Sequence, residues 1–378
     1  MPRNRRVLAV ALALVLFGAS AVVFAAVVHK GKSHNGGAIP TSPTGTGTQN
    51  GPFNSTPIKT LAADKFGIST GVQLFTEKND KISPDIAGIA AVGAHWMRTA
   101  IRWDLVEPDS ANADDWTKPD LIVNDAQKQG MKLILNITGT PPWARSPGAG
   151  NVEFPPDLHT YAAFAAKMAA RYKGKVAAYE LGNEPNHVKS FARPDPQLYE
   201  QVLQDSYPLI KAADPNVLVL TGGLGGIKDK DGVVPGNVYL ADLYKDGAKP
   251  YFDGVSYHPY TYPQLPSSDS AKPGWTRMLA ARQTMVDNGD SAKKIFVTEY
   301  GAPTGGPNSV SQDQQAAIMY DAYRLWATYS WAGPLCWFDY RDKGTDTTDH
   351  GNFFGLYTKS GQQKVAFSQY QSLVQSAR

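Results

Sequence analysis

The sequence predicts an α/β fold, a single (β/α)8 barrel, for most of the chain. Apolar segments rich in β-branched residues alternate with segments of helical periodicity from about residue 62 to the C-terminus. Strands that alternate with helices pair in parallel through right-handed crossovers. The segment holds eight such strands, and its length suits an eightfold barrel, which typically needs roughly 250 residues. An open doubly wound sheet is the alternative, but the turn after the first strand lacks the G-x-G-x-x-G sequence that binds dinucleotides.

The expected strands are short apolar runs that end at polar residues, Gly or Pro. In chain order they cover residues 66–74, 95–101, 131–138, 176–182, 216–221, 252–257, 294–299 and 334–339. The expected helices carry start and stop signals, such as Ser83 before Pro84, and Gly130 after the second helix. The first helix begins at Ser83, and the others cover residues 119–129, 158–172, 198–213, 238–246, 275–288, 311–326 and 364–375.

The N-terminus has the pattern of a targeting segment. Arg3, Arg5 and Arg6 precede an apolar stretch over residues 7–28, which is long enough to span a bilayer. We therefore expect a signal peptide or signal anchor over residues 1–30. Residues 31–61 are rich in Gly, Pro, Ser and Thr and are expected to form a flexible linker. This organisation predicts one folded domain over residues 62–378, located outside the cytoplasm, either anchored in the cell membrane through the N-terminus or secreted.

The composition excludes several classes of protein. The net charge is only +3, without a long basic block beyond the N-terminus, so a nucleic-acid partner has little electrostatic support. The single cysteine, Cys336, excludes an intramolecular disulfide framework and a cysteine-based zinc site, and its apolar neighbours predict burial. Asp342, Asp346 and Asp349 do not have the spacing of a calcium-binding loop. We expect neither a metal ion nor a cofactor.

Two glutamates follow short apolar strands and precede residues that end them. Glu184 lies in LGNEPN at residues 181–186, and Glu299 lies in FVTEYG at residues 296–301. In a (β/α)8 barrel, functional side chains gather at the carboxyl ends of the strands, so Glu184 at the fourth strand and Glu299 at the seventh can face one pocket. Two carboxylates across a pocket can cleave a glycosidic bond: one protonates the leaving oxygen, and the other attacks the sugar carbon or activates water.

Further polar and aromatic residues fall at the same strand ends. Asn183 is suited to bind a sugar hydroxyl, and Arg98 is either a contact of Glu299 or a structural partner of buried carboxylates. Aromatic rings stack on the C–H faces of sugars, but rings in such positions also pack in cores, and a histidine can be a hydrogen-bonded core residue. The remaining candidates for substrate binding are Trp103, Asn136, Trp143, His258, Tyr260 and Trp337.

These motifs resemble those of the clan A retaining glycoside hydrolases. The N-E-P sequence at strand four and the glutamate at strand seven carry the resemblance. The PPWA segment at residues 141–144, HPY at residues 258–260 and the segment 349–355 look most like family 39, with its bacterial exopolysaccharide hydrolases, and family 5 cellulase-like enzymes are the second choice. The resemblance implies that Glu184 is the general acid/base and Glu299 the nucleophile, and that the reaction retains anomeric configuration. It also implies an oligosaccharide or polysaccharide substrate.

Two alternatives keep the same fold. A carbohydrate-binding protein of the cell envelope would have weak or no turnover, although the presence of both glutamates disfavours it. A transglycosylase would use the same covalent intermediate but would transfer the sugar to another glycan, which lengthens chains where a hydrolase shortens them.

Overall fold

The structure is a computed structural model that describes residues 61–111, 114–145, 157–188, 190, 194–225, 232–268 and 274–377. The predicted signal segment, residues 1–30, and all of the predicted linker except its last residue lie outside the described residues, so both stay predictions. Within the described ranges, no helix combines the length and the apolar character needed to cross a membrane.

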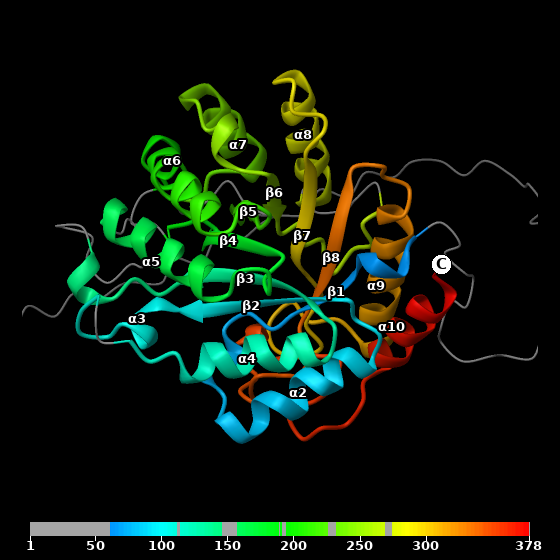
Figure 1. Ribbon diagram of the computed structural model, residues 1–378. Coiled ribbons are helices and arrows are strands. Elements are labelled where there is room, and N and C mark those ends of the chain that lie inside the picture. The colour runs from blue at the N-terminus through cyan, green and yellow to red at the C-terminus, as the bar shows by residue number, and fades with distance from the viewer. Residues whose placement is uncertain are drawn as a thin grey trace, which may run out of the picture. The chain divides into compact units, whose positions relative to one another are not determined.

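Eight parallel strands close into a barrel, with each strand paired to the next and the last paired to the first (Figure 1). The strands are β1 Phe66–Ser69, β2 Trp96–Arg102, β3 Lys132–Thr138, β4 Ala178–Asn183, β5 Leu218–Gly223, β6 Gly254–Tyr257, β7 Lys294–Tyr300 and β8 Ala332–Phe338. The predicted (β/α)8 fold, the TIM barrel, is confirmed.

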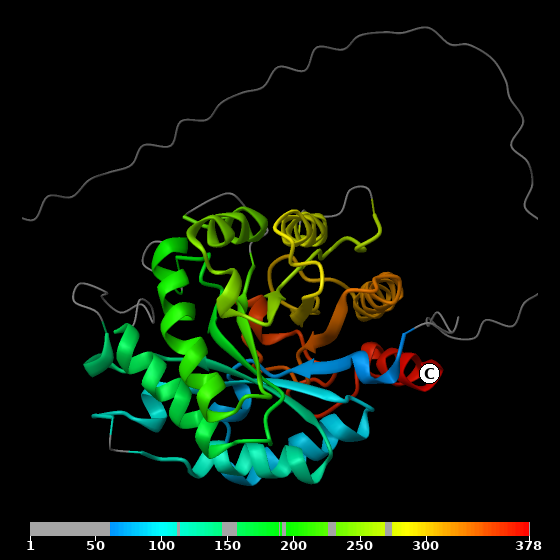
Figure 2. The same ribbon diagram turned by 45° about the horizontal axis from the view of Figure 1, so that its top comes forward.

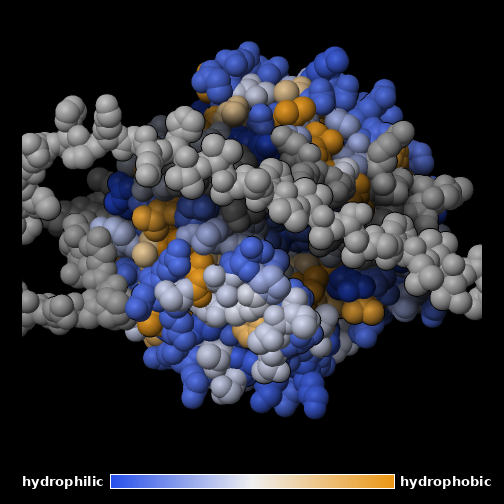
Figure 3. Space-filling model, turned by 180° about the vertical axis from the view of Figure 1, so that it is seen from behind, coloured by the Kyte–Doolittle hydropathy of each residue, from blue (hydrophilic) through white to orange (hydrophobic). Residues whose placement is uncertain are grey.

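In the described ranges, eight long helices lie outside the strands (Figure 2). They are α2 Asn79–Ala91, α4 Thr117–Lys128, α5 Leu158–Arg171, α6 Pro196–Ala213, α7 Gly236–Asp246, α8 Gly274–Asp287, α9 Gln312–Trp326 and α10 Val365–Ser376. Short helices α1 Gln73–Thr76 and α3 Trp103–Val106 follow the first two strands. Much of the coloured surface seen from behind is hydrophilic, with separate hydrophobic patches (Figure 3).

Two element boundaries differ from the prediction by more than two residues. The first strand ends at Ser69, because Gly71 has a φ of 51° that breaks the extended chain, and α1 then begins at Gln73. Helix α2 begins at Asn79, so Pro84 lies inside it, and the Ser83 hydroxyl donates to Asp125 on the neighbouring helix α4 rather than capping α2. Local start signals are thus overridden by a contact between helices.

The barrel interior is built in layers that follow the twofold period of the strands. Its apolar layer takes one residue from each of six strands: Trp96, Ile134, Ala178, Leu220, Phe296 and Cys336. Two residues further along, four of these strands place polar side chains, all buried: Arg98, Asn136, Glu180 and Thr298. Burying such groups is costly unless they bond to each other. The polar layer therefore requires the hydrogen-bond network described below, and it lies directly under the carboxyl ends of the strands.

Candidate active site

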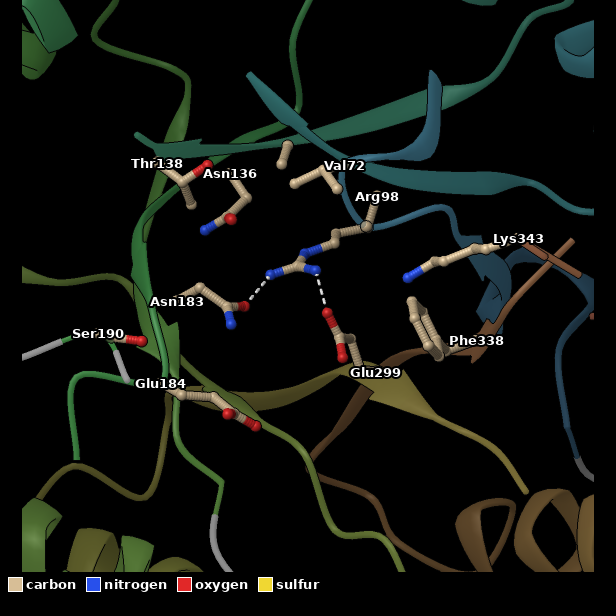
Figure 4. A pocket seen from close by; sticks show the side chains of 12 residues that line it. Val72, Arg98, Asn136, Thr138, Asn183, Glu184, Ser190, Glu299, Phe338 and Lys343 are labelled. Atoms are coloured by element: carbon tan, nitrogen blue, oxygen red, sulfur yellow. Dashed lines mark hydrogen bonds and ion pairs between the residues drawn. The ribbon is translucent and has the colours of Figure 1, made fainter. Parts of the chain in front are cut away.

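A cavity of about 490 Å³ opens at the carboxyl ends of the strands (Figure 4). Both predicted glutamates line it: the Glu184 side chain is 28% exposed and the Glu299 side chain 14% exposed. The other lining residues are Gly71, Val72, Arg98, Ala100, Asn136, Thr138, Asn183, Ser190, Phe338 and Lys343. The strand ends thus bring together residues from segments far apart in the chain.

The local backbone presents the Glu184 carboxylate to the cavity. Glu184 follows the last residue of β4 and has a φ of 46°, a left-handed conformation that is uncommon outside glycine. Its N–H donates to the carbonyl of Gly223 at the end of β5, at 3.1 Å. A Cβ added to Gly225 would lie 2.4 Å from Oε1 of Glu184, so a side chain at this position would displace the carboxylate. The strained residue and the adjoining glycine together point to a position selected for function.

An irregularity in β7 presents Glu299. The register between β7 and β8 shifts between Val297 and Tyr300. Thr298 belongs to the inner polar layer, Glu299 also reaches the cavity, and Tyr300 packs against Trp275, with ring centroids 5.6 Å apart. A regular strand would point consecutive residues to opposite faces, so the shift lets Thr298 and Glu299 both serve the site.

The surroundings of Glu299 hold it in the ionised form. Arg98 Nη1 donates to Oε1, and the Tyr260 hydroxyl donates to Oε2 at 3.0 Å. Burial alone would raise the pKa of the carboxyl. The charges of His258, Arg98 and Lys343 outweigh it, so the pKa of Glu299 lies below the ordinary glutamate value. An ionised carboxylate in this position can act as a nucleophile or as a base.

Arg98 is fixed by three side chains at once. Its Nε donates to Glu180 Oε2 at 2.7 Å, its Nη2 donates to Asn183 Oδ1 at 2.7 Å, and its Nη1 binds Glu299. Arg98 and Glu180 are almost completely buried. The two roles proposed for Arg98 therefore coexist: it pairs with a buried carboxylate and touches Glu299 directly. The rigid fork of the guanidinium positions Asn183 and Glu299 relative to each other.

A second chain of hydrogen bonds runs from Glu180 to Glu184. The Thr298 hydroxyl donates its proton to Glu180 Oε1 at 2.9 Å, and its oxygen lies 3.1 Å from His258 Nε2. Because a hydroxyl carries one proton, Thr298 accepts the proton of Nε2–H. His258 Nδ1 then faces Glu184 Oε1 at 3.1 Å and is free to accept a proton from it or donate one to it.

The position of His258 sets an upper limit on the distance between the two glutamates. Its Nδ1 lies 3.1 Å from Glu184 Oε1 and 3.9 Å from Glu299 Oε2, so these two oxygens can be at most about 7 Å apart. Burial lowers the pKa of His258, but the Glu299 and Glu184 carboxylates outweigh this effect and raise it above the ordinary value. A proton on Nδ1 of His258 can therefore be donated to Glu184 Oε1.

Most of the predicted polar candidates are brought to this site. Asn136 and Asn183 line the cavity, and the Asn136 amide donates to the carbonyl of Gly182 at 2.7 Å, which fixes the end of β4. His258 and Tyr260 are not among the lining residues, but they contact the two glutamates that are: His258 lies against Glu184, and Tyr260 donates to Glu299.

The three predicted tryptophans are not brought to the cavity. Trp103 is fully buried, stacks on Phe164 at 5.1 Å and donates to Glu107 Oε2 at 2.7 Å. Trp143 packs edge-on against Trp103 at 5.6 Å and donates to the carbonyl of Glu107 at 2.8 Å. Trp337 is fully buried and packs on Tyr300, with centroids 6.0 Å apart. Trp103 and Trp337 are packing residues of the barrel, which corrects the expectation that they bind substrate. Trp143 is half-buried and is not among the residues that line the cavity, and its role in binding stays a prediction.

Among the residues of the site that were not anticipated, four contribute to its chemistry or its wall: Glu180, Thr298, Phe338 and Lys343. Two of them had a signal in the sequence. Glu180 is a glutamate inside an apolar strand, which requires a buried partner. Phe338 is two residues beyond Cys336, and the period of a strand places both on the inner face. Lys343 follows β8 in a loop, where no periodicity indicates its direction.

Comparison with known proteins supports this assignment of the fold. The sequence model of the cellulase family (glycosyl hydrolase family 5) matches residues 57–334. No curated protein sequence matches the chain. The resemblance to a clan A glycoside hydrolase, with families 39 and 5 as the named choices, is confirmed.

Several solved structures share the barrel. A family 39 glycoside hydrolase from Bacteroides cellulosilyticus has a TM-score of 0.68 and 20% identity, over 84% of this chain and 64% of that one. A β-xylosidase from Caulobacter crescentus has a TM-score of 0.62 and 18% identity, over 83% and 68%. A family 5 enzyme from Streptomyces cattleya, solved with GlcNAc, has a TM-score of 0.56 and 15% identity, over 84% and 80%. The chain thus spans less than two thirds of the first of these proteins.

Proposed function

Because the chain belongs to the cellulase family, glycosyl hydrolase family 5, we propose that it hydrolyses O-glycosidic bonds of an oligosaccharide or polysaccharide by double displacement. Glu299 is the nucleophile, and Glu184 is the general acid and base. The observation that carries this proposal is the position of His258 Nδ1, 3.1 Å from one carboxylate and 3.9 Å from the other at the edge of one cavity.

In the first step, a Glu299 carboxylate oxygen attacks the anomeric carbon of the bound sugar. The bond from that carbon to the leaving oxygen breaks, and Glu184 gives its proton to the oxygen. Arg98 and Tyr260 hold Glu299 by one oxygen each, which aims the carboxylate and keeps it ionised until it bonds to the sugar. The products are the released alcohol or sugar and a glycosyl ester on Glu299.

In the second step, Glu184 takes a proton from water, and the water oxygen attacks the anomeric carbon. The ester bond to Glu299 breaks, and the carboxylate returns to its ion pair with Arg98. The proton left on Glu184 restores the starting state. His258 supports both steps because its Nδ1 bonds to Glu184 in either protonation state, as acceptor or as donor.

The separation of the two carboxylates is compatible with double displacement. Retaining enzymes place the carboxyl groups about 5–5.5 Å apart, whereas inverting enzymes need about 6.5–9.5 Å to admit a water molecule. The upper bound of about 7 Å between the facing oxygens covers the retaining range and little of the inverting one. Two successive displacements then give retention of anomeric configuration.

We place this activity outside the cytoplasm on the pattern of the N-terminal sequence. Basic residues followed by an apolar stretch over residues 7–28 are typical of a signal segment, and the Gly/Pro/Ser/Thr-rich residues after it suit a tether. Polysaccharides of the cell envelope or the surroundings are then the substrates within reach. Localisation of the full chain by fractionation of cells tests this part, and recovery in the cytoplasm contradicts it.

Two variants test the catalytic assignment. With a glycan that the enzyme cleaves, Glu299→Gln removes the nucleophile and abolishes turnover while the substrate still binds. Glu184→Ala slows cleavage of glycans by roughly 10²- to 10⁴-fold. Aryl glycosides with a good leaving group need little protonation, so their glycosyl ester accumulates on this variant. Azide then restores turnover, because it attacks the ester without a base.

The azide product should have the same anomeric configuration as the substrate. Glu77→Gln, a carboxylate that pairs with Lys359 outside the cavity, is the matched control and should behave like the unmodified enzyme. Undiminished cleavage by Glu299→Gln contradicts the assignment of the nucleophile. Absence of azide rescue in Glu184→Ala contradicts the assignment of Glu184 as the general acid and base.

A further inference from the structure

Lys343 places a positive charge in the cavity wall that takes no part in the bond-making and bond-breaking steps of the proposed reaction. It lies in the loop after β8, where its backbone N–H donates to the carbonyl of Asn352 at 3.0 Å, and its side chain lines the cavity next to Phe338 (Figure 4). The ammonium lies 4.3 Å from the centre of the Phe338 ring. A Cβ added to Gly71 would lie 3.8 Å from Nζ.

The ammonium of Lys343 has no anionic partner among the described residues. Neither a hydrogen bond of Nζ nor an ion pair within 4.0 Å occurs in that part of the chain. The other partly shielded lysines donate to a carboxylate or a carbonyl: Lys364 binds Asp342 at 2.6 Å, for example, and Lys118 donates to the carbonyls of Phe75 and Glu77. A half-buried ammonium that keeps an unpaired face toward a binding cavity is suited to receive an anion from a ligand.

The charge of Lys343 acts in the part of the cavity next to Glu299. It lowers the pKa of Glu299, although the two side chains do not form an ion pair. Arg98 cannot supply charge to a ligand in the same way, because all three of its donor nitrogens already bind Glu180, Asn183 and Glu299. Lys343 is therefore the cation of the cavity wall that is open to a ligand, among the residues described.

An anionic sugar needs such a cation at this place. A carboxylate or sulfate group near the nucleophile is repelled by the ionised Glu299, and this repulsion is strong in a partly buried site. Lys343 can offset it. The ammonium also covers one face of Phe338, the aromatic residue of the cavity wall, where a neutral sugar would otherwise stack its C–H face.

We propose that the glycan cleaved here is acidic, and that Lys343 binds a carboxylate or sulfate group on the sugar held next to Glu299. This inference rests on the proposed function. It adds the class of the substrate: a glycan containing uronic acid or sulfated sugar, instead of a neutral one.

Matched substrates test the proposal. They are glycosides of one sugar and one anomer, presented in the neutral form, with a carboxylate at C6 and with a sulfate at O6, both as aryl glycosides and as oligosaccharides. We expect kcat/KM for one of the acidic forms to exceed that for the neutral form by about tenfold or more, since a bond to a charged group contributes that much. The ratio of kcat/KM for the acidic form to that for the neutral form should fall at about 1 M salt, where charges are screened beyond about 3 Å.

Variants separate binding of the substrate anion from a general effect on Glu299. Lys343→Met should lower kcat/KM for the preferred acidic form by roughly 10- to 100-fold and lower that for the neutral form much less, whereas Lys343→Arg keeps most of the preference. Lys245→Met, which removes an exposed lysine on helix α7, is the control for loss of one charge and should leave the preference intact.

Three results overturn the inference in distinguishable ways. If neutral forms are cleaved as well as acidic forms or better, the substrate is not acidic, and the proposed hydrolase function stands. If Lys343→Met lowers kcat/KM for the acidic and the neutral substrates by the same factor, and moves the acid limb of the pH profile to higher pH, then Lys343 only keeps Glu299 ionised and does not bind the substrate anion. If the enzyme cleaves no glycan of any class, the proposed function fails, and this inference falls with it.

Discussion

The substitution Glu180→Gln tests whether the buried network controls the proton of the site. Glu180 accepts hydrogen bonds from Arg98 at 2.7 Å and from Thr298 at 2.9 Å. A glutamine keeps the shape but replaces one acceptor oxygen with a donor NH₂ group. Because the Arg98 guanidinium has N–H donors and no acceptor, the amide oxygen of the glutamine must face Arg98, and its NH₂ group must face Thr298.

This replacement should reverse the polarity of the hydrogen-bond chain. The Thr298 oxygen then accepts from the glutamine, and its hydroxyl proton turns to His258 Nε2. The neutral imidazole carries its proton on Nδ1 instead and donates to Glu184, which favours the ionised carboxylate. Since a hydrogen bond to a charged group contributes about 1.5–3 kcal/mol, the basic limb of the kcat/KM profile should move to lower pH by about one unit or more.

Stability should fall as well, because the Arg98–Glu180 pair is almost fully buried. Breaking such a pair costs about 3–5 kcal/mol, and we expect about 3 kcal/mol because Arg98 keeps Glu299 and Asn183 as partners. Urea unfolding measures this loss, and kcat/KM from acid to alkaline pH measures the shift of the limb.

Glu107→Gln is the matched control. It also removes a buried carboxylate that binds a cation, here Lys167, but this carboxylate is not part of the cavity. It should lower stability and leave both limbs of the profile in place. If Glu180→Gln loses stability and keeps the profile of the unmodified enzyme, the network has only a structural role, and the reasoning on the tautomer of His258 is wrong.

Three further predictions concern pH and space. Burial raises the pKa of Asp339 to about 7, so its ionisation destabilises the fold: stability should fall as pH rises from about 4 to 8, by up to about 4 kcal/mol. Asp339→Asn should flatten this dependence in urea unfolding, and an unchanged slope contradicts it. The pKa of Glu299 is lowered, so the acid limb of kcat/KM should lie at lower pH than an ordinary glutamate would give, and an acid limb at or above the pH of an ordinary glutamate would refute this. Gly225→Ala places a Cβ 2.4 Å from Glu184 Oε1 and should reduce kcat by about 10²-fold while the protein still folds. A kcat close to that of the unmodified enzyme would show that the loop moves to make room for the methyl group.

The sequence was sufficient to predict the architecture because the periodicity of the elements is strong. Each of the eight expected strands overlaps an observed strand, and the helices from α4 to α10 begin and end within a few residues of their predicted bounds. Local signals failed where tertiary contacts decide. Ser83 and Pro84 have the pattern of a helix start, but the bond from Ser83 to Asp125 lies between two packed helices, which no local pattern reveals.

The site was predictable as far as strand ends determine it. Glu184 and Glu299 stand at strand ends, so they were recognisable, whereas the shift in β7 that turns Glu299 into the cavity depends on pairing with β8. Residue type favours Trp337 as a sugar-stacking residue, but strand alternation places Cys336 and Phe338 on the inner face instead. The direction of Lys343 is set by its loop and could not be predicted.

The anomeric configuration of the first product tests the pairing of Glu184 with Glu299 most directly. Proton NMR, recorded in the first minutes of cleavage before mutarotation mixes the anomers, reads it without assuming which residue attacks. The account predicts that the initial product has the configuration of the bond that was cut. Initial appearance of the opposite anomer would show a single displacement by water, and the assignment of Glu299 as a nucleophile would be wrong.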